Sequence, residues 1–162
     1  MNITRVDHIY ITVSDLAASE AFYDRVMKVF NFKKGIAPIG DEPHFHYFNR
    51  YLQISIRPAR VKRKFDPYSP GLHHICLEVP SRADVDEAAA ALRQQCIDSS
   101  KPKTYPQYAR DYYATFFSDP DGIRFEVVAR RDEREFIVKH WSELEGFVNP
   151  VRKLKEKLSR RG

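Results

Sequence analysis

The chain has 162 residues, enough for one domain or for two small modules that share a core. With 43% hydrophobic and 30% charged residues, the composition excludes a disordered or fibrous protein. No apolar run is long enough to cross a bilayer. The first residues enter a strand-like pattern directly, so we expect no signal peptide. We therefore expect a cytoplasmic protein in which Cys76 and Cys96 are both reduced.

The formal net charge of +5 is concentrated near the C-terminus. Residues 152–162 contain six Lys or Arg and a single Glu, so the charges in the rest of the chain balance. A nucleic-acid-binding protein usually spreads its basic residues over a folded face and adds stacking aromatic side chains. We therefore expect neither a nucleic-acid nor a membrane partner, and the predicted partner is a small-molecule substrate.

The first predicted strand, at residues 6–13, has a counterpart at residues 72–79. The two segments read VDHIYITV and LHHICLEV, so His8 aligns with His74. Both segments alternate apolar and more polar residues, which is typical of half-buried strands. Each of these histidines begins the more polar face of its strand. The sequence therefore contains a duplicated unit.

Each of these strands is followed by a predicted helix and then by short strands. Asp15 after Ser14, and Ser81 with Asp84, are helix-start signals. The strands that follow are expected at 32–37, 44–48 and 51–56 in the first unit, and at 103–105, 112–118 and 123–128 in the second.

The element order predicts an α+β protein made of two βαβββ modules, residues 1–57 and 71–131. Because neither module is large enough to stand alone, we expect them to form one domain, residues 1–131, with a curved and mostly antiparallel sheet. A helical extension is predicted for residues 132–162. Its first helix should end at Gly146, and Pro150 should begin its second.

The repeated histidines direct attention to the last strand of each module. Alternation along 123–128 turns Glu126 away from the helices, and we interpret Gln53 as its counterpart. His8, Gln53, His74 and Glu126 can then converge. Two imidazoles and a carboxylate leave positions open for a substrate, a donor set that suits Fe(II), Zn, Ni or Mn. The amide oxygen of Gln53 would be a weak fourth ligand.

The other histidines of the two modules receive no role from the sequence. His44 and His46 flank Phe45 on a predicted strand and are interpreted as surface residues. His73 lies on the opposite face from His74.

His8-Ile9, followed by Ser14-Asp15-Leu16 and Phe22-Tyr23, resembles the opening motif of the vicinal oxygen chelate superfamily. That group includes glyoxalase I, extradiol dioxygenases, methylmalonyl-CoA epimerase and bleomycin resistance proteins. GLHHI at 71–75 and DPDGIRFE at 119–126 resemble its second-module motifs, and the similarity covers about residues 5–129. The resemblance implies paired modules and a divalent metal ion held by His8, His74 and Glu126. It also implies chelation of a substrate through vicinal oxygens, with the ion as a Lewis acid.

The function implied by the resemblance is that of a glyoxalase-type, metal-dependent lyase or isomerase in which Glu126 is a possible base. Two alternatives stay open: an Fe(II) extradiol-type dioxygenase, and a metal-free ligand-binding protein of the bleomycin-resistance type. The candidates for substrate contact are Tyr10, Arg57, Tyr112 and Tyr113. Because paired-module proteins can exchange halves, the ligands meet either within one chain or across the expected homodimer.

Overall fold

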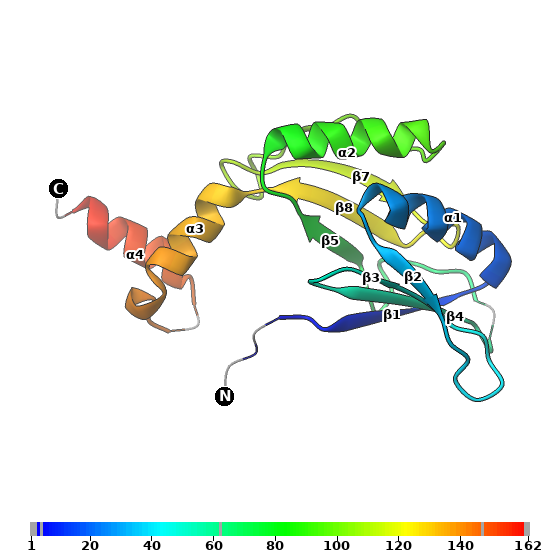
Figure 1. Cartoon of the computed structure of the whole chain (residues 1–162). Coiled ribbons are helices and arrows are strands. Elements are labelled where there is room, and N and C mark those ends of the chain that lie inside the picture. The colour runs from blue at the N-terminus through cyan, green and yellow to red at the C-terminus, as the bar shows by residue number, and fades with distance from the viewer. Residues whose placement is uncertain (1–2, 4, 62, 147, 161–162) are drawn as a thin grey trace.

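The computed structural model describes residues 3, 5–61, 63–146 and 148–160. It confirms the α+β class and the two βαβββ modules, which lie side by side in Figure 1. Module 1 consists of β1 (His8–Val13), α1 (Leu16–Val29), β2 (Lys33–Ile36), β3 (Phe45–Phe48) and β4 (Gln53–Pro58). Module 2 consists of β5 (His74–Glu78), α2 (Arg82–Gln94), β6 (Lys103–Thr104), β7 (Tyr113–Ser118) and β8 (Arg124–Ala129).

The helix starts match the sequence signals. The Asp15 carboxylate accepts a hydrogen bond from the Ala18 backbone N–H at 3.0 Å and so caps α1. The Ser81 hydroxyl caps α2 in the same way, with the Asp84 N–H at 3.2 Å. Each cap satisfies one of the amide groups left free at a helix N-terminus.

The described strands form two four-stranded sheets, in the orders β1-β4-β3-β2 and β5-β8-β7-β6, rather than the single expected sheet. In each module the first and last strands pair in parallel, and the remaining pairs are antiparallel. The parallel pair arises because a helix crossover separates β1 from β4 and β5 from β8. As a result, β1 and β5 are edge strands that carry His8 and His74 at their starts.

Of two hydrophobic core clusters formed by the described residues, the larger contains residues of both modules and joins them through α1. Phe22 packs near Phe117 of β7, and the buried Tyr23 hydroxyl donates to Asp119 at 2.8 Å. Asp121 accepts a hydrogen bond from the Ser14 N–H at 2.9 Å. The turn at residues 119–122 that leads into β8 is therefore fixed against module 1, and this fixes the position of β8.

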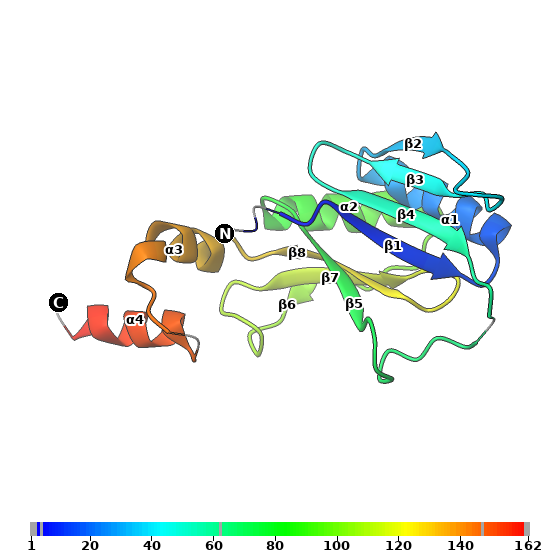
Figure 2. The ribbon, with the colours of Figure 1, turned by 90° about the horizontal axis from the view of Figure 1, so that it is seen from below.

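The C-terminal helices are α3 (Arg131–Lys139), the 3₁₀ helix η1 (Trp141–Glu143) and α4 (Pro150–Ser159). The prediction that the first helix continues to Gly146 is wrong, because the chain tightens into 3₁₀ turns after His140. Pro150 does begin the last helix. Figure 2 shows α3 and α4 projecting away from the sheets. Across the described residues, none of the helices has the length and apolar character of a membrane span.

Candidate metal site

His74 and Glu126 lie together on module 2. Their strands, β5 and β8, are parallel neighbours, and the His74 Nε2 atom is 3.5 Å from the Glu126 Oε2 atom. Glu126 is only 3% exposed, and its Oε1 atom has no hydrogen-bond partner within the described part of the chain. A buried carboxylate oxygen without a partner is costly, and a bound cation would compensate for it. This half of the predicted site therefore fits a metal ligand pair.

Two further side chains touch Glu126. Burial and a hydrogen bond to Glu126 raise the pKa of Tyr112 above its ordinary value. Burial, together with the Glu126 charge, raises the pKa of Cys76 to about 12. Both groups therefore stay protonated at neutral pH. Tyr112, one of the predicted substrate contacts, therefore lies beside Glu126.

Sequence reasoning missed an aromatic cluster beside the same carboxylate. The Tyr105 ring lies 5.9 Å from that of Tyr108 and 5.3 Å from that of Phe116, and Tyr108 lies 5.2 Å from Tyr112. Phe116 is the register partner of Glu126 on β7. The signal that could have revealed the cluster is the density of tyrosines at residues 105–113.

His8 begins β1 and is half exposed. Its Nδ1 atom is 2.9 Å from the Asp7 carboxylate, which leaves Nε2 as the nitrogen able to bind a metal ion. Metal-binding histidines commonly have such a carboxylate on the other ring nitrogen. Among the described residues of one chain, however, no three His, Cys, Asp or Glu side chains are close enough to hold an ion. His8 is therefore separated from the His74–Glu126 pair within the chain.

The strand register corrects the assignment of Gln53. His8 is paired with Gln53, whereas His74 is paired with Arg124. Gln53 therefore corresponds to Arg124 rather than to Glu126.

The true counterpart of Glu126 is Ser55. Glu126 is paired with Cys76 on β5, and Ser55 is paired with Tyr10 on β1. The predicted counterpart, Gln53, lies two residues before Ser55 on the same face of β4. Alternation with a period of two does not distinguish these two positions, because a shift of two residues leaves the pattern unchanged. A serine hydroxyl is shorter than a carboxylate and uncharged, so module 1 has no carboxylate at the position of Glu126.

The polar face of module 1 carries an array of imidazoles. The Nδ1 atom of His46 is 2.9 Å from the Ser55 hydroxyl oxygen, to which the Gln53 amide also donates at 3.0 Å. The Nδ1 atom of His44 is 3.3 Å from the Tyr10 hydroxyl. We call this surface the histidine face; it consists of His8, Tyr10, His44, His46, Gln53 and Ser55.

Two members of the histidine face are more buried than their sequence pattern indicated. His44 is 3% exposed and His46 is half-buried, so the interpretation of both as surface residues is wrong. Their spacing of two residues, with His44 directly before β3 and His46 within it, was the available signal, because in an extended segment this spacing places both imidazoles on one face.

The remaining candidates for substrate contact, Tyr10, Arg57 and Tyr113, lie in different surroundings. Tyr10 lies on the histidine face, with its ring 5.9 Å from that of His8. Arg57 forms an ion pair with Glu42, whose pKa is held below its ordinary value by a hydrogen bond from Arg60 and the Arg57 charge. Tyr113 does not contact the site.

Tyr113 is turned toward α2, where its hydroxyl donates to Asp86 at 2.8 Å. Adjacent residues of a strand face opposite sides, so Tyr113 cannot share the face that carries Tyr112 and Glu126. The prediction of Tyr113 as a substrate contact is therefore wrong.

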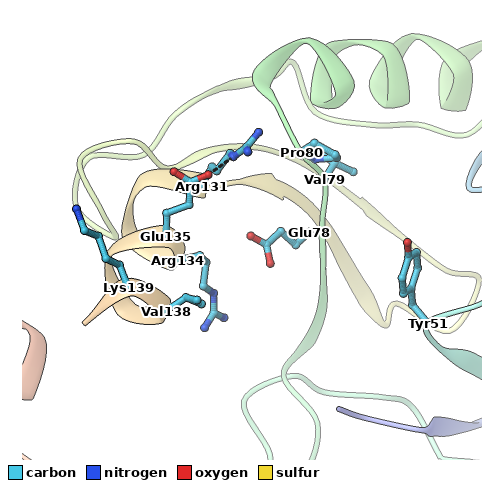
Figure 3. Close-up of a pocket in the computed structure, with 9 residues that line it drawn as sticks. All are labelled: Tyr51, Glu78, Val79, Pro80, Arg131, Arg134, Glu135, Val138 and Lys139. Carbon is cyan, nitrogen blue, oxygen red and sulfur yellow. Dashed lines mark hydrogen bonds and ion pairs between the residues drawn. The ribbon is translucent and has the colours of Figure 1, made fainter. Parts of the chain in front are cut away.

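A groove of about 720 Å³ lies elsewhere, between α3 and the end of β5. Figure 3 shows Arg131 and Glu135 of α3 paired on one side and Tyr51 on the other, with Glu78 between them. None of the predicted metal ligands lines this groove. It therefore adds nothing to the candidate metal site.

Two βαβββ modules, each beginning with a histidine and one bearing a buried glutamate on its last strand, define a paired-module α+β protein. The model of the Glyoxalase/Bleomycin resistance protein/Dioxygenase superfamily matches residues 5–127, and the chain belongs to this superfamily.

Curated relatives match most of the chain without establishing an activity. The uncharacterized protein YaeR of Escherichia coli (strain K12) is 27% identical over 138 residues, which cover 78% of this chain and 97% of YaeR. The uncharacterized protein YqjT of Bacillus subtilis (strain 168) is 26% identical over 126 residues, covering 75% of this chain and 96% of YqjT.

Solved structures support the fold. A glyoxylase/bleomycin resistance protein/dioxygenase domain from Frankia sp. EAN1pec has a TM-score of 0.65 at 23% identity, covering 79% of this chain and 98% of that one. The lactoylglutathione lyase from Agrobacterium tumefaciens has a TM-score of 0.59 at 20% identity, covering 80% and 96%. At these identities the similarity concerns the fold alone.

Proposed function

We propose that this protein is a metal-dependent enzyme that binds a small oxygenated metabolite through two neighbouring oxygens and catalyses proton transfer of the lyase or isomerase type. The observation that carries the proposal is the buried Glu126 carboxylate: one oxygen has no hydrogen-bond partner among the described residues, and the other is 3.5 Å from the His74 Nε2 atom. A divalent ion held by His74, Glu126 and His8 would supply Lewis-acid chemistry to a substrate carbonyl. Fe, Zn, Ni and Mn all suit this donor set.

The chain's own residues would prepare this site in two ways. Burial of Glu126 strengthens its interaction with any cation, because the local dielectric is low. Asp7 holds the His8 ring by its Nδ1 atom. Glu126 is also the candidate base for a proton on the carbon next to the carbonyl.

The separation of His8 from His74 leads to the proposed assembly. We infer a homodimer in which His8 of the partner subunit completes the site formed by His74 and Glu126. Each pair of chains would then contain two equivalent sites, as two-fold symmetry requires. We also propose a reducing, cytoplasmic location for the protein, with which the free thiols of Cys76 and Cys96 are consistent.

The test is complementation between two defective chains. His8→Ala and His74→Ala chains, carrying different affinity tags, are co-expressed, and the heterodimer is purified through both tags. A site shared between chains leaves one intact site in the heterodimer, so metal analysis should find one bound ion per heterodimer and none in either parent. A heterodimer without metal, beside a loaded wild type, would contradict the shared site. A wild type that binds its ligands without metal would favour the binding protein instead.

An Fe(II) dioxygenase is the second candidate, and Ser55 is the observation that favours it. Without a fourth protein ligand at this position, two histidines and one carboxylate remain, the arrangement typical of non-haem Fe(II) oxygenases. Oxygen uptake by the iron-loaded protein with catechol would select this function. Carbon–hydrogen exchange without oxygen uptake would select proton transfer.

A further inference from the structure

We propose that His46 is a substrate-contacting residue that donates a hydrogen bond from Nε2 to the substrate oxygen on which negative charge develops. This inference rests on the proposed function and deepens it, because it assigns the ligand class. The ligand would be an α-hydroxy or α-keto compound whose carbonyl oxygen becomes anionic when a proton leaves the adjacent carbon.

The hydrogen-bond partners of the Ser55 hydroxyl indicate which ring nitrogen of His46 carries the proton. The Gln53 side chain donates its Nε2–H to the Ser55 hydroxyl oxygen at 3.0 Å, so this oxygen already accepts a bond. Ser55 is fully buried, and its own proton needs an acceptor. The Nδ1 atom of His46 lies 2.9 Å from the Ser55 oxygen and, among the described residues, is the group placed to accept this proton. A neutral imidazole that accepts at Nδ1 carries its proton on Nε2.

Gln53 and Ser55 are thus positioning residues: they form a series of hydrogen bonds that runs from Gln53 through Ser55 to His46. This series of hydrogen bonds disfavours the Nδ1–H tautomer of His46, because a proton on Nδ1 would leave the buried Ser55 proton without an acceptor. It also holds the imidazole ring in one orientation. Donors that are oriented before charge develops contribute more than donors that must reorganise.

The neighbours of His46 on this face are a glycine on one side and Tyr10 on the other. Its register partner on β2 is Gly35, which has no side chain to cover it. On the other side, the ring of Tyr10 lies 6.2 Å from the His46 ring and 5.9 Å from the His8 ring. The 40% exposed Tyr10 therefore separates a proposed metal ligand from the proposed donor. A small chelated metabolite that lies across Tyr10 would reach both.

The first test needs neither metal nor ligand. Nitrogen-15 NMR of the metal-free protein reports which ring nitrogen of His46 is protonated. We expect the Nε2–H tautomer in the wild type and a tautomer mixture in Ser55→Ala. An Nδ1–H tautomer in the wild type would overturn the proposal.

The second test uses glycolohydroxamate, an anionic bidentate probe, on the zinc-loaded protein. His46→Leu should bind it about 10- to 100-fold more weakly, the range expected for a lost hydrogen bond to a charged group. His46→Gln should recover much of the affinity, because an amide N–H also donates. His140→Gln, at the end of α3 and outside both modules, is the control and should bind like the wild type.

The outcomes separate this inference from the proposed function. The donor role would be overturned if His46→Leu bound glycolohydroxamate as tightly as the wild type, or if His46→Gln failed to recover binding. It would also be overturned if the zinc-loaded wild type did not bind glycolohydroxamate. A wild type that binds no metal would remove the proposed function, while the NMR result would still decide the state of His46.

Discussion

Modules 1 and 2 share an order of strands, a capped helix and a histidine at the start of the first strand, but their polar faces carry different groups. Module 2 presents one buried carboxylate beside His74, surrounded by tyrosines. Module 1 places a serine at the position of that carboxylate and adds His44 and His46 around it. A duplicated scaffold has therefore kept its geometry while its two faces have diverged, with a buried carboxylate on one and imidazoles around a serine on the other.

The largest expected effect tests the anionic half of this comparison. Glu126→Gln keeps the shape of the side chain but removes its charge. We expect metal affinity to fall by more than about 100-fold, because loss of a ligand should exceed the 10- to 100-fold effect of an outer-shell partner. Competition with a chromophoric zinc chelator measures the affinity. Glu78→Gln, on an exposed residue of β5, should leave it unchanged; equal losses in both variants would contradict the special role of Glu126.

A second variant tests how firmly one module positions the other. Tyr23→Phe removes the hydroxyl that donates to Asp119 at 2.8 Å in the buried contact between modules. We expect a loss of about 1–3 kcal/mol in the free energy of unfolding, the cost of leaving a buried acceptor unpaired. Urea denaturation measures it. The matched control, Tyr47→Phe, loses a bond to Asp24 within module 1, next to solvent, and should cost less.

The cost of Tyr23→Phe should depend on pH. Burial raises the pKa of Asp119 above its ordinary value of 3.8, while the Tyr23 hydrogen bond opposes this rise. With a raised native pKa, the stability contributed by this group is complete below the ordinary pKa and is lost as pH rises through the native pKa. Without Tyr23 that pKa rises further, so the loss should be largest at neutral pH and shrink toward the ordinary pKa. A loss independent of pH would show that the hydroxyl acts through packing alone.

A third variant tests the register assignment of Ser55. Ser55→Glu places a carboxylate at the counterpart of Glu126 and should tighten zinc binding by about tenfold, the lower end of what a group next to a metal contributes. Gln53→Glu places the same charge at the counterpart of Arg124 and should not. If Gln53→Glu tightens binding and Ser55→Glu does not, the modules do not correspond as their strand pairing indicates. Circular dichroism checks that both variants fold.

The sequence was sufficient for elements that depend on local patterns. The repeated strands at His8 and His74, the caps at Asp15 and Ser81, and Pro150 at the start of the last helix are encoded by alternation and capping chemistry over a few residues.

The sequence was not sufficient where a long-range contact decides. The register between β1 and β4 depends on the packing of the whole module, so the choice between Gln53 and Ser55 was not local. Burial of His44 likewise depends on Tyr10 from another strand. Whether His8 joins His74 depends on how whole modules pack, which no spacing in the chain specifies.

The smallest expected effect concerns what the two modules still have in common. Asp15→Ala and Ser81→Ala each remove the side chain that accepts from a backbone N–H in the first turn of α1 or α2. Each should lower the free energy of unfolding by about 1 kcal/mol, the usual cost of losing an N-cap. The two losses should be similar and should add in the double variant, because the caps share no partner. Chemical denaturation measures all three variants. A much larger loss at one cap would mean that the scaffold, and not only the chemistry of its faces, has diverged between the modules.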